Sequence, residues 1–215
     1  VFNFKFSKKI KSKYKSFELI IANNVLNHSN NPLDFVKGVK NLLTDGGKFV
    51  FEVPYWLETV KSLKYDQIYH EHITYFTAFF SKNLLKKAGL DIIDIEVVPY
   101  HGGSLRIIAI KSKKQKKYIL KLKQMIKFEK KFKLFEIKTY ELFNKKIEKQ
   151  KIVFLNKLLN IKKNNYVIIG VGAAAKANTF INYHKLDSSI ISYITDASKH
   201  KIDKFTPFSR ILIKK

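Results

Sequence analysis

One strand–helix–strand pattern near the start of the chain constrains the fold most. The apolar run FELIIA (17–22) has the length of a strand, and loop-forming residues follow it. PLDFVKGVKNLL (32–43) has Pro in a first-turn position and apolar side chains along one helical face. TDGG (44–47) should end this helix, and KFVFEVP (48–54) then indicates a second, buried strand. This order predicts a parallel sheet covered by helices, which is an α/β fold.

The next part of the chain predicts an antiparallel extension of that sheet. FFSKNLLKKAG (79–89) indicates a helix that ends at its final glycine. LDIIDIEVV (90–98) and SLRIIAIK (104–111) indicate two strands with a short glycine-containing turn between them, an arrangement typical of an antiparallel pair at a sheet edge. The residues before Phe17 contain FNFKFS, which we expect to form a strand at most.

A charged helical stretch leads to a second α/β unit. Between about residues 113 and 160, Lys and Glu are interspersed with periodic Leu, Ile and Phe, which indicates one long helix or two, with the charges on a solvated face. NYVIIGVGAAAKANTFINY (165–183) indicates a strand, a glycine-rich turn and a helix, and ISYITDAS (191–198) a further strand. The predicted divisions of the chain are residues 1–112, 113–163 and 164–215.

The composition argues against several classes of protein. The chain has no Cys, which excludes disulfides and thiolate metal sites. No apolar run reaches the roughly 20 residues of a membrane span, and no secretory signal is visible, so we expect a cytoplasmic monomer with no membrane span. The net charge of +25 suggests nucleic-acid binding, but only Arg106 and Arg210 of the 42 basic residues are arginines. We expect no nucleic-acid partner, and keep a basic nucleic-acid-binding module as an alternative.

The glycine-rich turn GVGAAAKAN (170–178) lies between a predicted strand and a predicted helix, as a dinucleotide-binding fingerprint requires. Gly170 and Gly172 would allow a tight turn and close approach to a phosphate. Asp196 follows near the position of a ribose-binding acid. A nucleotide-like ligand and a tight turn without any ligand are both compatible with this pattern.

The stretch YDQIYHEHITYF (65–76) contains two of the six histidines of the chain, His70 and His72. Their spacing of two residues does not suit the helical HExxH metal motif, so we expect no metal site. Histidine is matched to proton abstraction near neutral pH, which favours a proton-transfer site. An ordinary hydrogen-bonded loop is the other interpretation. His184 and His200 have no motif around them and are expected at the surface.

Five motifs in order resemble the S-adenosylmethionine-dependent sugar C-methyltransferase family: FELIIANNVLNH, LLTDGGKFVFEVPY, YDQIYHEHITYF, PYHGGSLRI and GVGAAAKANTFINY. The resemblance covers nearly the whole chain. It implies a partial class I methyltransferase Rossmann-like sheet, a helical linker and a second, smaller Rossmann-like α/β domain. Residues 1–112 would be the C-terminal part of the methyltransferase domain, 113–163 the linker and 164–215 part of the C-terminal domain.

The resemblance also implies a reaction. Enzymes of this family methylate a carbon of a nucleotide-linked deoxy-keto-sugar, with S-adenosylmethionine as the methyl donor. His72 would be the base that generates an enolate, Tyr69 and His28 would lie near the sugar, and Glu71 would orient the cluster. Asn23 and Asn24 would lie near the methionine end of the donor. The implied contacts to the nucleotide-sugar are His101, Gly102, Gly103, Arg106, Lys176 and Asn178, although a structural ion pair is an equal alternative for Arg106.

The resemblance further implies that the chain is a fragment. The family has a cysteine-built N-terminal zinc domain and a glycine-rich donor-binding loop, and neither is visible in this sequence, which starts without Met. We therefore expect zinc only in that absent domain, and expect the fragment itself to be inactive. In the family the glycine-rich turn carries no redox chemistry. A dehydrogenase-like protein that binds NAD(P) through residues 170–178 is the alternative.

Overall fold

The computed structural model describes residues 2–111 and 119–215, which form two compact units. The first unit consists of Val1–Ser62 and His70–Thr139, and the second of Leu63–Tyr69 and Tyr140–Lys215. The predicted division between residues 112 and 113 lies outside the described residues.

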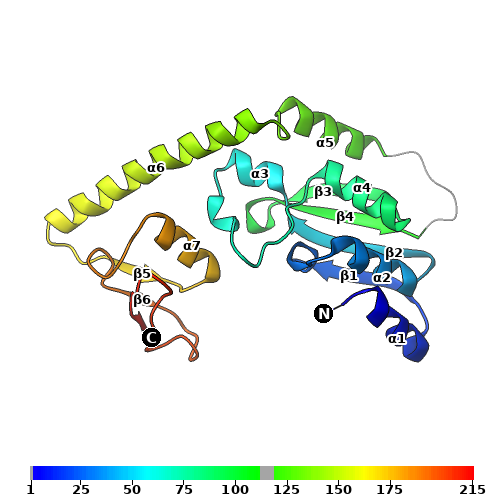
Figure 1. The fold of residues 1–215 in the computed structure, drawn as a ribbon, viewed down its shortest axis with the longest axis horizontal. Helices are drawn as coiled ribbons and strands as arrows, with labels where there is room; N and C mark the ends of the chain where they lie inside the picture. Colours follow the sequence, from blue (N-terminus) through cyan, green and yellow to red (C-terminus); the bar gives the residue numbers. More distant parts are fainter. Residues whose placement is uncertain (1, 112–118) are drawn as a thin grey trace. The chain divides into compact units, whose positions relative to one another are not determined.

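A four-stranded sheet forms the centre of the first unit (Figure 1). Its strands are β1 (Phe17–Asn23), β2 (Leu43–Pro54), β4 (Ser104–Ile110) and β3 (Asp91–Val98), in that spatial order. β1 and β2 are parallel, whereas β4 is antiparallel to both of its neighbours, β2 and β3. The predicted strand–helix–strand unit and the antiparallel edge pair are therefore confirmed.

The helices of this unit begin and end where local side chains satisfy their free backbone groups. The Asn31 side chain accepts from the Asp34 amide at 3.0 Å at the start of α2, and Pro32 occupies the first turn. α4 ends at Gly89, whose φ of 78° is left-handed as predicted. The helices up to this point are α1 (Phe4–Tyr14), α2 (Pro32–Leu42), α3 (Trp56–Lys61) and α4 (Ala78–Ala88).

The prediction for the first residues was wrong, because they form α1 rather than a strand. The alternating FNFKF pattern extends over few residues, and the polar stretch after it continues the helix. Asn3 caps the helix, its side chain accepting from the Phe6 amide at 2.7 Å. The Phe4 amide donates to the Asp34 carboxylate at 3.1 Å, which ties α1 to α2.

TDGG is also not a separate turn. β2 already begins at Leu43, which pairs with Phe17, and the next pairing is Leu19 with Lys48. Residues 44–47 therefore bulge out of the strand, and the φ of 77° at Gly46 accommodates the bend.

One face of the sheet is buried and the other is partly open. Phe49, Phe51 and Val53 of β2 are fully buried, as are Leu105 and Ile107 of β4. These residues alternate along their strands with more exposed ones, as expected of a sheet whose one face is packed against helices.

The described part of the charged stretch contains the helices α5 (Leu120–Lys131) and α6 (Ile137–Lys163). Most of their Lys and Glu side chains are exposed, as predicted for a solvated face. Glu129 is the exception that the prediction missed, because it is fully buried in the first unit. Among the helices of the described residues, none is both long enough and apolar enough to cross a membrane.

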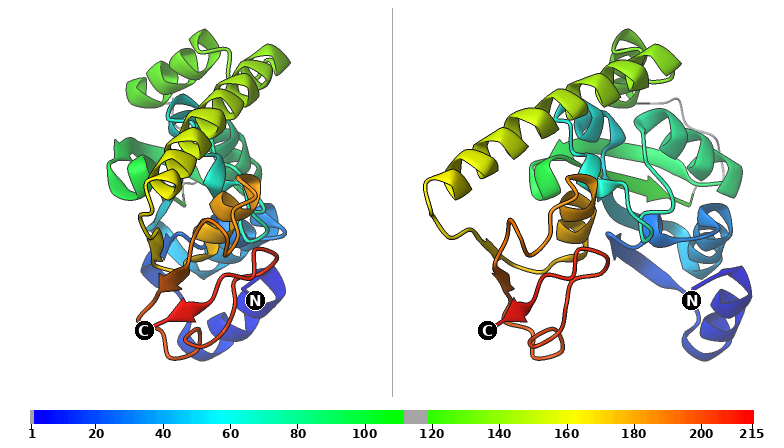
Figure 2. Two further views of the ribbon diagram at one scale, coloured as in Figure 1. Left: turned by 90° about the vertical axis from the view of Figure 1, so that its left-hand side faces the viewer. Right: turned by 60° about the vertical axis from the view of Figure 1, so that its left-hand side comes forward.

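The second unit contains a small parallel sheet of β5 (Ile169–Val171), β6 (Tyr193–Thr195) and β7 (Ile213–Lys214). Figure 2 presents this sheet in gold to red together with α7 (Ala175–Tyr183), which follows the glycine-rich turn. Leu158, Ile181, Ile194 and Ile211 belong to its buried core. The predicted smaller Rossmann-like unit is confirmed.

Candidate functional site

The carboxyl ends of β1 and β2 lie side by side, since these two strands are parallel and Asn23 pairs with Glu52. Ligands of open α/β sheets bind beyond the carboxyl ends of the strands. Asn24 turns the chain away with a φ of 52°, which Asn tolerates better than most residues, and its amide donates to the Glu52 carbonyl at 2.8 Å. A short 3₁₀ turn, η1 (Leu26–His28), follows.

Backbone hydrogen bonds hold the second half of the YHEH stretch against this turn. The amides of Ile73 and Thr74 donate to the Asn27 carbonyl at 3.0 and 3.1 Å. Further along, the Trp56 amide donates to the Phe76 carbonyl at 2.9 Å. Residues 71–75 themselves have no regular structure, so these bonds fix the path of the loop.

The loop places His72 beside His28. The two imidazole centroids are 5.1 Å apart and the ring planes meet at 71°, an edge-to-face contact. His72 is 8% exposed, whereas His28 is half-buried. Two imidazoles from segments distant in sequence therefore meet beyond the carboxyl end of β1, and such a pair can accept, hold or donate a proton near neutral pH.

Glu71 and Tyr69 are placed differently. The Glu71 carboxylate is exposed and lies 3.9 Å from Nε2 of His70, which is also exposed. Tyr69 is half-buried and is the last residue of the Leu63–Tyr69 segment, which belongs to the second unit. The boundary between the two units thus passes through the YHEH motif.

Asn27 is a candidate that the sequence prediction missed. Its side chain is 2% exposed, and neither Oδ1 nor Nδ2 has a hydrogen-bond partner among the described residues. Oδ1 of Asn24 is likewise buried without a described partner. Buried polar atoms nearly always have a hydrogen-bond partner. The side-chain atoms of Asn24 and Asn27 in the loop that contains His28 therefore lower the stability of the fold unless a ligand or water molecule pairs with them. The loop NNVLNH offered three asparagines, but nothing in its pattern indicated which of them is buried.

Arg106 is engaged in ion pairs across the sheet. It lies opposite Glu52 of β2 and Glu96 of β3. Its Nε donates to Glu52 at 2.6 Å and its Nη1 to Glu96 at 3.0 Å. The structural ion pair weighed for this residue is therefore present.

The HGG turn adopts backbone conformations that favour glycine. His101, Gly102 and Gly103 have φ values of 51°, 73° and 117°. A Cβ at Gly103 would lie 2.8 Å from Cβ of Glu58, so a larger residue would be both strained and crowded. The exposed His101 ring contacts Tyr100, with the centroids 4.2 Å apart.

In the second unit, Asp196 supports the glycine-rich turn itself. Its Oδ2 accepts from the Ala173 amide at 2.8 Å and from Nζ of Lys201 at 3.2 Å, and its Oδ1 accepts from the Ser198 amide at 2.9 Å. The Ser198 and Ala173 amides, followed by Lys201, lower the pKa of this carboxylate. In a dehydrogenase-like site, these carboxylate oxygens would instead have to accept hydrogen bonds from the ribose hydroxyls of the nucleotide.

The two glycines of the turn have different roles. Gly172 has a φ of 86°, and its amide donates to the Thr195 carbonyl at 2.7 Å. A Cβ at Gly170 would lie 2.8 Å from a side-chain carbon of Ile194, so Gly170 permits close strand packing. Lys176 lines a cavity of about 480 Å³ next to the turn, and Asn178 is half-buried on α7.

His184 contradicts the expectation of a surface residue, because it is 4% exposed. It packs in the second unit against Phe154 and Phe180, at centroid distances of 4.9 and 4.2 Å. His200 is exposed as predicted. Within the described parts of the chain, no three His, Asp or Glu side chains cluster in a way that could hold a metal ion.

Comparison with known proteins covers both units. Residues 99–215 match the C-methyltransferase C-terminal domain family, and residues 2–95 match a methyltransferase domain family. C-methyltransferase NovU of Streptomyces niveus is 26% identical over 180 residues, which are 84% of this chain and 43% of NovU. The chain therefore spans less than half the length of this relative.

Two solved structures share a similar arrangement over 45% of this chain. One is an S-adenosylmethionine-dependent methyltransferase from Clostridium acetobutylicum, with 16% identity, 59% of that chain covered and a TM-score of 0.36. The other is magnesium protoporphyrin IX methyltransferase from Synechocystis, with 13% identity, 46% of that chain covered and a TM-score of 0.36.

Proposed function

The chain belongs to the C-methyltransferase family, and from this we propose that it carries the proton-abstracting centre of an enzyme that methylates a carbon of a nucleotide-activated keto-deoxysugar. The methyl donor would be S-adenosylmethionine, which supplies an electrophilic methyl group on sulfur when it is bound. The observation that carries the proposal is the contact between His28 and His72 beyond the carboxyl end of β1.

The reaction follows from the acidity of a C–H bond next to a ketone. Neutral His72 takes the proton, and the electrons of the broken C–H bond form an enolate. A bound methyl donor would supply the methyl group to the enolate carbon, and its sulfur would keep the electrons of the old carbon–sulfur bond. His28, in edge contact with His72, is suited to donate a hydrogen bond to the enolate oxygen, where negative charge develops. Tyr69 is the second proposed donor to this oxygen.

The loop after β1 has groups that fit the methionine end of the donor. Oδ1 of Asn24 is a buried acceptor without a described partner, which suits an ammonium group. Asn23, at the exposed end of β1, would contribute from the same loop. Glu71, exposed beside His70, would tune the charge around the histidines.

Each unit, taken by itself, contains residues proposed to bind the nucleotide-sugar. His101, Gly102 and Gly103 offer a backbone turn that a bulky side chain does not block, and Lys176 offers a cation at the glycine-rich turn. Asn178 would add a hydrogen bond from α7. Arg106 is the weaker member of this set, because its guanidinium already pairs with two carboxylates.

The test uses the full-length enzyme with S-adenosylmethionine and a nucleotide-linked keto-deoxysugar, with mass spectrometry of the product. We predict that His72→Ala and His72→Asn lower methyl transfer by about a hundredfold or more, since general-base catalysis contributes on that scale. Donor binding, measured by calorimetry, should be unchanged. His200→Ala, on an exposed residue, is the control. Turnover by His72→Ala at the parental rate would refute the assignment of the base.

A further inference from the structure

A short segment of the first half of the chain belongs to the second unit. Leu63–Tyr69 is part of the second unit, whereas the residues before and after it, up to Ser62 and from His70, belong to the first. The segment is entered through a left-handed residue, since Leu63 has a φ of 53°, which is uncommon for a leucine. It leads directly into His70–His72.

Tyr65 attaches this segment to α7. Its ring lies 4.7 Å from the Tyr183 ring and stacks at 6.3 Å on Phe180, at an interplanar angle of 18°. Its Oη is 3.3 Å from Nδ1 of His184. Aromatic pairs in this geometry each contribute about 0.5–1.5 kcal/mol beyond burial, so the ring is a substantial anchor for a seven-residue segment.

The pocket for Tyr65 is itself fixed. Nδ1 of His184 lies 2.9 Å from the Phe180 carbonyl, which can only accept, so Nδ1 carries the proton and the Tyr65 oxygen accepts from it. Burial lowers the pKa of His184, which keeps the ring neutral. The Tyr183 hydroxyl donates to Glu148 of α6 at 2.6 Å, and Lys151 lies over the Tyr183 ring.

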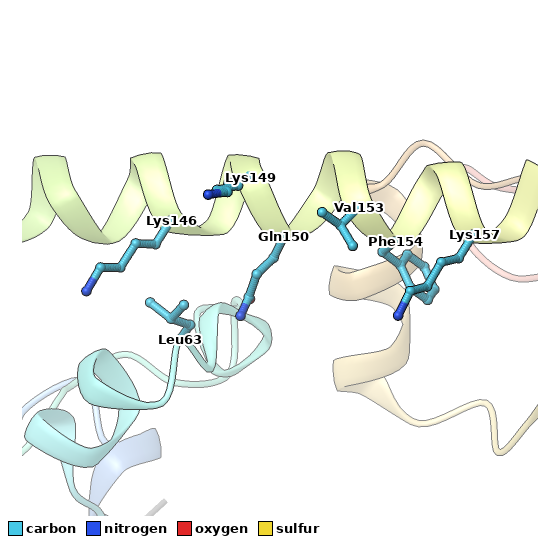
Figure 3. A pocket seen from close by; sticks show the side chains of 7 residues that line it. All are labelled: Leu63, Lys146, Lys149, Gln150, Val153, Phe154 and Lys157. Atoms are coloured by element: carbon cyan, nitrogen blue, oxygen red, sulfur yellow. The ribbon is translucent and has the colours of Figure 1, made fainter.

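The start of the segment lies beside α6. Leu63 lines a pocket of about 380 Å³ on that helix, and Figure 3 shows its side chain near the end of Gln150. The other side chains around this pocket are Lys146, Lys149, Val153, Phe154 and Lys157. Leu63 thus lies beside α6, whereas the ring and hydrogen-bond contacts that attach the segment are those of Tyr65 with α7 and His184.

We propose that Tyr65 is a positioning residue for methyl transfer, which acts by docking the Leu63–Tyr69 segment on α7 and so fixing Tyr69 and the adjoining His72. This inference rests on the proposed function. α7 starts directly after the glycine-rich turn and carries Lys176 and Asn178, the proposed substrate contacts. The helix that carries these two residues is therefore also the helix that holds the segment leading to the base.

The test compares three variants of the full-length enzyme. Tyr65→Ala removes the ring, Tyr65→Phe keeps it and removes only the hydroxyl, and Tyr166→Ala changes a tyrosine of the same unit that is 67% exposed. We expect Tyr65→Ala to lower kcat about tenfold to a hundredfold with little change in the donor KM, because small displacements of reacting groups cost that much. Tyr65→Phe should recover most of the rate, and Tyr166→Ala should behave as the parent. Should Tyr65→Ala not fold, Tyr65→Leu replaces it.

Hydrogen exchange gives a readout that does not depend on turnover. The amides of Ile73 and Thr74, which bond to the Asn27 carbonyl, should exchange faster in Tyr65→Ala but not in Tyr166→Ala. Parental kcat together with parental exchange at these amides in Tyr65→Ala would overturn the proposal. If the unmodified enzyme transfers no methyl group, the proposed function fails, whereas the exchange experiment still decides whether Tyr65 positions the loop.

Discussion

Asn27 combines two properties at the scale of a single residue. Its carbonyl accepts from two amides of the YHEH loop, which fixes the loop, while its side-chain amide is buried without a described partner. An unmade hydrogen bond in the interior costs about 1–3 kcal/mol. Substituting the Asn27 side chain would leave its backbone carbonyl free to accept from the Ile73 and Thr74 amides, and would remove the unpaired amide group that destabilises the fold.

We predict that Asn27→Leu raises the free energy of unfolding by about 1–3 kcal/mol, because an apolar side chain of similar size removes the unpaired amide. Urea denaturation followed by circular dichroism measures the change. Asn30→Leu, at an exposed position of the same loop, is the control and should differ from the parent by less than about 0.5 kcal/mol. A less stable Asn27→Leu protein would mean that the amide has an undetected partner, such as a buried water molecule.

At this scale the sequence predicted which two histidines lie together better than it predicted which polar side chains are buried. The motifs identified His28 and His72 as belonging to one site, and the structure brings their rings together. Asn27, Glu129 and His184 were missed or misplaced, because burial of a polar side chain depends on what packs around it. No local pattern encodes that environment.

At the scale of elements, Glu129 joins α5 to the start of α4. Its carboxylate accepts from the Ala78 and Phe79 amides, the first free amides of α4, and from the Tyr55 hydroxyl at 2.9 Å. A carboxylate at this position satisfies donors that have no partner within the helix and also complements the helix dipole. Phe76, the end of the YHEH stretch, pairs with Tyr55 and lies just before the capped turn.

We predict that Glu129→Gln lowers the free energy of unfolding by about 1–3 kcal/mol, because an NH2 group, which cannot accept a hydrogen bond, replaces one of the two oxygens that accept from the Ala78 and Phe79 amides. Burial raises the pKa of Glu129 above its ordinary value of 4.5, against the opposing effect of its hydrogen bonds. The folded protein therefore holds the proton to higher pH than the unfolded chain does. Stability from this group is fully present below about pH 4.5 and declines as the pH rises through the raised pKa.

Thermal unfolding of parent and variant between pH 4 and pH 8 measures this difference. The advantage of the parent over Glu129→Gln should shrink as the pH rises. Glu136→Gln is the matched control, since Glu136 is on the surface and pairs with Lys133 at 3.6 Å. If the stability difference between the parent and Glu129→Gln grew as the pH rises, the raised pKa of Glu129 would be contradicted.

The order of elements could be predicted because hydrophobic periodicity and glycine signals are local. FELIIA and KFVFEVP became β1 and β2, and Gly89 ended α4, as the patterns indicated. The stretch before β1 failed because three alternating aromatics suggest a strand, whereas the cap at Asn3 starts a helix. TDGG failed because glycines serve a strand bulge as well as a turn.

At the scale of the whole molecule, no pattern in the sequence indicated that residues 63–69 belong to the second unit. Tyr65 is one aromatic among several in its stretch, and its assignment to the second unit depends on residues such as His184, more than a hundred positions later. The family resemblance supplied the order of the parts. The crossing of Leu63–Tyr69 into the other unit follows only from the folded chain.

The less buried face of the four-stranded sheet is a property of the whole first unit. Leu19 and Ile21 of β1 are 51% and 60% exposed and lie beside Lys48 and Val50 of β2. Neighbouring apolar side chains on an accessible sheet face form a surface that binds apolar probes. The far edge of β1 pairs with no strand among the described residues.

We predict that Leu19→Thr with Ile21→Thr lowers the fluorescence of the dye ANS bound to the 215-residue polypeptide. Thr suits strands, so the free energy of unfolding should change by less than about 1 kcal/mol, since the scale of strand propensities spans no more than that. Val171→Thr, at a position 85% exposed in the second unit, is the control for removing one isolated apolar side chain and should leave the fluorescence unchanged. Equal dye binding by the parent and the double variant would mean that Leu19 and Ile21 are covered in solution, and that the apolar surface of this unit lies elsewhere.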